Sequence, residues 1–160
     1  MSKRSALLAE RIEQGAAMLA AFAEGLSDAQ WHTVVPSDGR EVGVIIHHVA
    51  SIYPIEIGLA RDVASGKEVE GVTWGVVAEL NAKHTQDHAE VGKQETIELL
   101  HTNAHSAAEV ARSLSDEELD RAAAVSLNAD APLTTQFLIE DHALRHSWHH
   151  LAKIKAALGN

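Results

Sequence analysis

Four histidines lie close together near the carboxyl end of the chain, in the segment DHALRHSWHHLAKI, residues 141–154. They are His142, His146, His149 and His150. Imidazole is the most common protein ligand for zinc, nickel, copper and iron near neutral pH. Two histidines that are four residues apart on a helix lie on the same face and can bind one ion. The segment therefore predicts a metal site on a helix, completed by a ligand from elsewhere in the chain.

The helical repeat indicates which pair of these histidines faces inward. At about 100° per residue, His146 and His150 share an apolar strip with Ile139, Ala143 and Ile154. His142 and His149 fall further round, toward the polar side. We therefore expect the pair 146/150, rather than 142/146, to face the other helices.

A second histidine pair, His47 and His48, lies in a segment expected to be helical from about 41 to 64. His48 shares an apolar face with Val44, Ile45 and Ile52, so it is predicted to be buried and His47 to be exposed. A buried polar group that stays unpaired costs about 1–3 kcal/mol. One divalent ion bound by His48, His146 and His150 would satisfy all three rings. Three histidines with an open fourth position are typical of catalytic rather than structural zinc.

Other residues near this expected site allow more than one interpretation. Asn81, His84 and His88 can line the pocket, and His84 and His88 are also spaced for a second ion, but a solvated or hydrogen-bonded position is the ordinary expectation. Glu56 is a candidate carboxylate base for hydrolysis, although an edge residue in contact with solvent is the simpler interpretation. A lone inward-facing histidine is likewise more often a hydrogen-bonded core residue than a ligand. His101 and His105 are expected on the surface, and Trp74, Trp148 and Tyr53 in the core or an interface.

These side chains require long helices to position them. The 160 residues are rich in Ala, Leu, Val and Ile and are predicted to form one domain over 1–160. Helices are expected at about 5–23, 41–64 (bent at Pro54), 76–113 (weak near Gly92 and His101) and 134–158, with short capped turns after Ser27 and Ser115. No strand-like alternation is evident. The predicted fold is all-α, an up-down four-helix bundle.

Composition excludes several classes of function. A net charge of −10 disfavours a nucleic-acid partner. The absence of Cys excludes disulfides and a thiolate nucleophile, so any metal ligands are nitrogen or oxygen atoms. The first residues do not resemble a signal peptide, and we expect no apolar run long enough to span a membrane. A cytoplasmic protein without a membrane partner is expected.

Two short motifs resemble the DinB-like (DNA-damage-inducible) metal-binding bundle superfamily. VIIHHVAS, residues 44–51, resembles the family's second helix, in which a His precedes a Leu/Val-Ala pair. HSWHHLAKI, residues 146–154, resembles its last-helix His-x3-His signature. The order of the other features, with Trp31 after the first helix and a Gly-containing loop before the histidine helix, is also similar.

The resemblance implies His48, His146 and His150 as ligands of zinc or nickel, completed by water. Lys153 stands where the family usually has Gln or His, so the role of that position is not carried over. The family also implies a homodimer and, in its better-understood branches, the use of bacillithiol or mycothiol as a thiol cosubstrate. We therefore expect a metal-dependent thiol S-transferase; the alternatives are a metal-dependent hydrolase and a non-catalytic metal-binding dimer.

Overall fold

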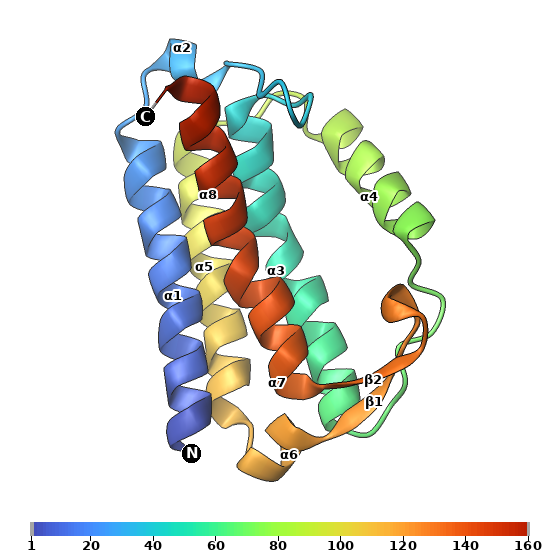
Figure 1. Cartoon of the computed structure of the whole chain (residues 1–160). Coiled ribbons are helices and arrows are strands. Elements are labelled where there is room, and N and C mark those ends of the chain that lie inside the picture. The colour runs from blue at the N-terminus through green and yellow to red at the C-terminus, as the bar shows by residue number, and fades with distance from the viewer. Residues whose placement is uncertain (1, 160) are drawn as a thin grey trace.

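Four long helices lie side by side in the computed structural model, which describes residues 2–159 (Figure 1). They are α1 (Lys3–Glu24), α3 (Val42–Ala64), α5 (Lys93–Ser113) and the C-terminal helix that ends with α8 (Arg145–Leu158). The chain direction, followed by colour, shows that α1 and α8 run one way and that α3 and α5 run the other way. The fold class predicted from the sequence, an all-α four-helix bundle, is confirmed, but the predicted up-down order of the helices is wrong because α3 and α5 run in the same direction.

Short polar motifs set the helix ends. Ser27 and Ser115 each form a capping box, and these open the short helices α2 (Asp28–Trp31) and α6 (Asp116–Asp120) as predicted. Gly159 adopts a left-handed conformation with φ of 74° and ends α8. The sequence therefore determines these boundaries through local hydrogen bonding.

The single long helix predicted at 76–113 is wrong, because the chain forms two helices there. α4 (Trp74–Asp87) ends at His88, and α5 begins after Gly92 and continues without a break through His101. α4 lies outside the four-helix bundle, next to α3, and returns the chain from the end of α3 to the start of α5 (Figure 1). This return is what allows α3 and α5 to run in the same direction.

A small β-hairpin was not predicted. β1 (Ala122–Val125) pairs antiparallel with β2 (Ala131–Thr134), and a 3-10 turn, η1 (Ser126–Asn128), joins them. Val69, in the loop after α3, forms a parallel bridge with Val125. The strands have no alternating apolar pattern, because β1 consists of three alanines and Val125 and because little of the hairpin is buried. The hairpin holds the loop before α4 close to the start of the last helix.

The last helix contains a change of helical type. α7 (Thr135–Leu138) leads into a π-helical segment, η2 (Ile139–Leu144), and then into α8. π-Helical turns inside α-helices are rare and are frequent at functional sites. This segment immediately precedes the turn that carries His146.

The core is built from small and branched aliphatic side chains. α3 is the most apolar helix of the described chain, and its length and mean hydropathy of 1.5 would suffice to cross a membrane, contrary to our expectation from the sequence. However, 61% of that apolar window is buried inside the bundle. Packing against α5 and the last helix therefore accounts for its apolar character.

Candidate metal centre

Three histidines from two helices meet in the half of the bundle that faces α4. His48 of α3 and His150 of α8 are buried, with 5% and 7% of their surface exposed, and His146 is half-buried. One ring nitrogen from each of the three lies within 4.8 Å of those of the other two. The ring centroids of His48 are 5.1 Å from His146 and 5.6 Å from His150. The structure thus brings together the three residues expected to share one ion, while their role as ligands stays a prediction.

Helix geometry explains this convergence. His146 and His150 are one turn apart on α8, and their rings stack with centroids 4.8 Å apart. α3 and α8 are joined beneath them by a buried hydrogen bond of 2.5 Å between the Tyr53 hydroxyl and Ser147 Oγ. This contact fixes the relative position of the two helices that carry the rings. Tyr53 is a core residue, as expected.

Glu56 has a more specific position than the sequence indicated. It is buried (8% exposed), and its Oε1 lies 2.6 Å from His146 Nδ1. If Nδ1 donates its proton to this carboxylate, the lone pair of Nε2 remains free to bind an ion. The expectation that Glu56 is solvated is wrong. Its place one helical turn beyond Ile52 on α3 brings it under the His146 ring.

The protonation state of the three-histidine cluster favours the binding of a cation. Burial, followed by the proximity of His146, lowers the pKa of His48 to about 3. Burial, followed by the proximity of His146 and His48, lowers the pKa of His150 to about 2. Both rings are therefore neutral at physiological pH, which is the form that binds a metal. The nitrogen His150 Nδ1 is buried and has no hydrogen-bond partner among residues 2–159. An ion at this position would satisfy groups that the protein alone leaves unpaired.

The cluster lines a cavity of about 520 Å³ between α3, α4 and α8. One wall is apolar and includes Ile52 and Leu59 of α3 together with Val77 and Leu80 of α4. Charged side chains also line the cavity, among them Asp38, Arg40, Asp141, Arg145 and Lys153. This volume suits a small-molecule ligand. The sequence did not indicate Asp38 and Arg40, because they lie in a loop, 32–41, that only the fold brings to α8.

Several other predictions can be compared with this cavity. Asn81 lines it, which was the alternative to the solvated position ordinarily expected. Trp74 does not belong to the core, since it is 70% exposed and lies at the cavity. His142 and His149 also line its wall. His101 and His105 are on the surface, as expected.

His47 was predicted to be exposed, and this is wrong. It is half-buried, and its Nδ1 lies 2.9 Å from His84 Nε2 on α4. Its ring centroid is 4.3 Å from that of His88. The face of α3 opposite the bundle core is covered by α4, which the sequence did not place there. His84 and His88 therefore pack against His47 and are not among the residues that line the cavity.

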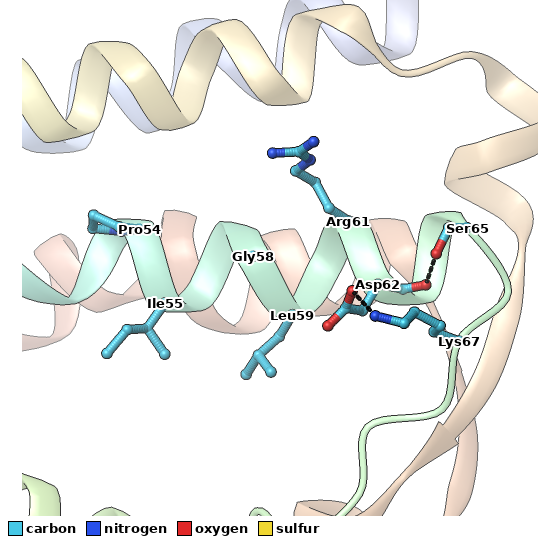
Figure 2. Close-up of a pocket in the computed structure, with 8 residues that line it drawn as sticks. All are labelled: Pro54, Ile55, Gly58, Leu59, Arg61, Asp62, Ser65 and Lys67. Atoms are coloured by element: carbon cyan, nitrogen blue, oxygen red, sulfur yellow. Dashed lines mark hydrogen bonds and ion pairs between the residues drawn. The ribbon is translucent and has the colours of Figure 1, made fainter.

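A second hollow lies on the outer surface of α3, in its C-terminal half (Figure 2). Its side chains include Ile55 and Leu59, which point to one side of the helix, and an ion pair of 3.1 Å between Lys67 and Asp62. A pair of this kind is exposed to solvent and contributes little to binding. None of the histidines discussed above lines this hollow.

Comparison with known proteins supports this description. Residues 11–154 match the family model of the DinB superfamily. A solved structure described as YfiT from Bacillus subtilis, a probable metal-dependent hydrolase with an unusual four-helix bundle topology, superposes with a TM-score of 0.76. The identity is 18%, and the alignment covers 98% of this chain and 87% of the YfiT chain, so the likeness concerns the fold. No significant match was found among curated proteins.

Proposed function

The chain belongs to the DinB superfamily, and three imidazoles meet in its cavity. We therefore propose that it uses one divalent ion to activate a small nucleophile, a thiol or water. His48, His146 and His150 are the proposed ligands. Zinc and nickel suit an all-imidazole site of this kind. A bound ion lowers the pKa of a thiol or water at its open position and supplies a nucleophile near neutral pH. The single observation that carries the proposal is the convergence of these three rings within one cavity.

The favoured reaction is the transfer of a low-molecular-weight thiol such as bacillithiol or mycothiol. The sequence has no Cys, so the sulfur nucleophile has to arrive with the cosubstrate. The thiol would lose its proton to solvent, its sulfur would form a bond to an electrophilic carbon, and the electron pair of the bond broken at that carbon would leave with the displaced group. Arg40, Arg145 and Lys153 at the cavity offer cationic partners for an acidic cosubstrate.

Thiol binding gives the direct test. Isothermal titration of zinc-loaded and nickel-loaded protein with bacillithiol, mycothiol and glutathione should detect binding of at least one thiol. His146→Ala should abolish this binding, whereas His101→Ala, on the surface of α5, should preserve it. Failure of all three thiols to bind would contradict the transferase proposal and leave the metal site untouched.

Hydrolysis is a second candidate because Glu56 is a buried carboxylate at the cavity. The structural neighbour YfiT is also described as a probable metal-dependent hydrolase. In this alternative a bound water replaces the thiol as the nucleophile. A panel of ester and amide substrates distinguishes the two activities, and hydrolysis that is unchanged in Glu56→Gln would remove Glu56 as its base.

We also propose that the chain forms a homodimer, following the family resemblance. Sedimentation equilibrium would give the oligomeric state directly. Metal binding without turnover of any thiol or ester would favour the third possibility, a non-catalytic metal-binding dimer.

A further inference from the structure

A second group of three histidines lies at the contact between α3 and α4. It consists of His47 on α3, His84 on α4 and His88, which caps the C-terminal end of α4, and we call it the α3–α4 trio. One ring nitrogen from each residue lies within 4.8 Å of those of the other two. His47 and His48 are consecutive, so α3 directs one histidine toward each cluster. The rings of His48 and His84 are 5.5 Å apart between centroids, which makes the clusters neighbours.

Hydrogen bonding between the rings does not satisfy the α3–α4 trio. His47 Nδ1 and His84 Nε2 form one contact of 2.9 Å. His88 packs against both rings, with centroid distances of 4.3 Å to His47 and 4.7 Å to His84. The other nitrogen of His84, Nδ1, is buried and has no hydrogen-bond partner within residues 2–159. Three imidazoles are thus packed together with one hydrogen bond between rings, and Ser51 Oγ adds a contact of 3.3 Å to His47 Nδ1.

α4 has few other attachments to the bundle. None of its fourteen residues, all within the described chain, is buried. Its ends are held through the flanking loops, where Ser126 Oγ bonds Val72 and Trp31 Nε1 donates to the Val91 carbonyl. Between these ends, one side-chain hydrogen bond among the described residues joins α4 to another helix. It links His84 and His47. A link between α3 and α4 at the trio would therefore restrict the movement of α4 more than a link at either end.

We propose that His47, His84 and His88 bind a second divalent transition-metal ion, which fastens α4 to α3. Three imidazoles without a carboxylate select zinc, nickel, cobalt or copper rather than calcium or magnesium. α4 supplies Trp74, Val77, Leu80 and Asn81 to the wall of the cavity that contains the first cluster. An ion in the trio would thus restrict the movement of α4, which forms this wall, without being part of the first site.

Stoichiometry tests the second site. Untagged protein is dialysed to equilibrium against zinc chloride, and bound zinc is measured by elemental analysis. Wild-type protein should bind two equivalents per chain. The double variant His84→Ala/His88→Ala should bind one, and so should His146→Ala/His150→Ala. The control His101→Ala/His105→Ala removes an exposed pair of the same spacing and should still bind two.

The outcomes separate the two sites. One equivalent in wild-type protein that His84→Ala/His88→Ala retains, or two equivalents in that variant, would overturn the second site. If His146→Ala/His150→Ala still binds two equivalents, the first site fails instead. Because α4 contributes no buried residue among those described, its substitutions should leave the bundle folded, which circular dichroism verifies.

Hydrogen exchange tests the fastening itself. In the His146→Ala/His150→Ala background, zinc can occupy only the trio, and it should slow amide exchange in residues 74–87 severalfold relative to the same protein in EDTA. The effect should disappear when His84→Ala/His88→Ala is added. Exchange in 74–87 that does not change with zinc, while zinc is bound, would show that the ion does not fasten α4.

Discussion

At the scale of single residues, the imidazole of His146 is the best-oriented group in the proposed metal site. Its Nδ1 faces Glu56 at 2.6 Å, which leaves its Nε2 available as the ligand atom. A carboxylate in this position fixes the tautomer of a ligand histidine and raises its basicity. Glu56 is therefore a positioning residue for the metal, whichever nucleophile the ion activates.

Replacing Glu56 by Gln should weaken zinc binding at the first site by about 10–100-fold, because the charged acceptor is lost while the shape of the side chain is kept. Competition with a chromophoric chelator measures the affinity. Glu98→Gln, on the exposed side of α5, is the matched control and should leave the affinity unchanged. Equal affinities in both variants would show that Glu56 does not support the ligand.

The lowered pKa values of His48 and His150 predict a dependence of stability on pH in the metal-free protein. In the unfolded chain both groups take up protons below about pH 6.5, but in the folded protein they stay neutral down to about 3 and about 2. The unfolded state thus binds more protons in this window, and stability falls as the pH falls. Each histidine should contribute up to roughly 1.4 kcal/mol per pH unit below pH 6.5.

Urea unfolding in EDTA between pH 7 and pH 5 measures this slope. His48→Asn removes one titrating group, so its stability should depend less steeply on pH than that of the wild type. His101→Asn, at an exposed position, should retain the wild-type slope. A wild-type slope in His48→Asn would contradict the burial of a neutral imidazole.

At the scale of helices, the start of α3 depends on a close approach to α2. A Cβ added at Gly43 would clash with the Trp31 ring, which is buried and donates a hydrogen bond to the Val91 carbonyl. A ring enclosed in this way cannot move aside without loss of packing. This contact places the first turn of α3, and therefore also sets the depth at which His48 enters the bundle.

Gly43→Ala should destabilise the protein by about 1–3 kcal/mol because it overpacks this contact. Gly58→Ala on the same helix meets no atom within 4 Å and should instead stabilise the protein by about 0.5–1 kcal/mol through the higher helix propensity of Ala. Chemical denaturation of the two variants gives both values. Similar effects of the two substitutions would mean that the Trp31 contact does not constrain α3.

At the scale of the whole molecule, ligands from α3 and α8 make the proposed metal site a link across the bundle. An ion held by residues that are distant in sequence binds the folded state and not the unfolded chain. Binding should therefore raise the stability of the entire chain rather than that of one helix.

Zinc at about 100 times its dissociation constant should add about 2.7 kcal/mol, which corresponds to a rise in Tm of roughly 5–10 °C for a chain of this size. Differential scanning calorimetry with zinc and with EDTA measures the change. To isolate the first site, the comparison is made in the His84→Ala/His88→Ala background. The shift should vanish on addition of His146→Ala/His150→Ala, and a shift that persisted would place the stabilising ion elsewhere.

The sequence by itself determined the local features of this protein. Capping boxes at Ser27 and Ser115 and the stop at Gly159 were predictable because they depend on residues within one turn. The inward faces that carry His48 and His150 were predictable because a regular helix repeats its burial every three or four residues.

Only the tertiary structure decided what covers the remaining faces. The position of α4 turns His47 from an expected surface residue into a neighbour of His84 and His88, and the pairing of α3 with α8 turns Glu56 into the partner of His146. The hairpin and the π-helical segment also had no signal in residue type or spacing. Periodicity reports whether a face is buried, whereas the identity of the neighbours depends on contacts between segments far apart in the chain, which no local pattern encodes.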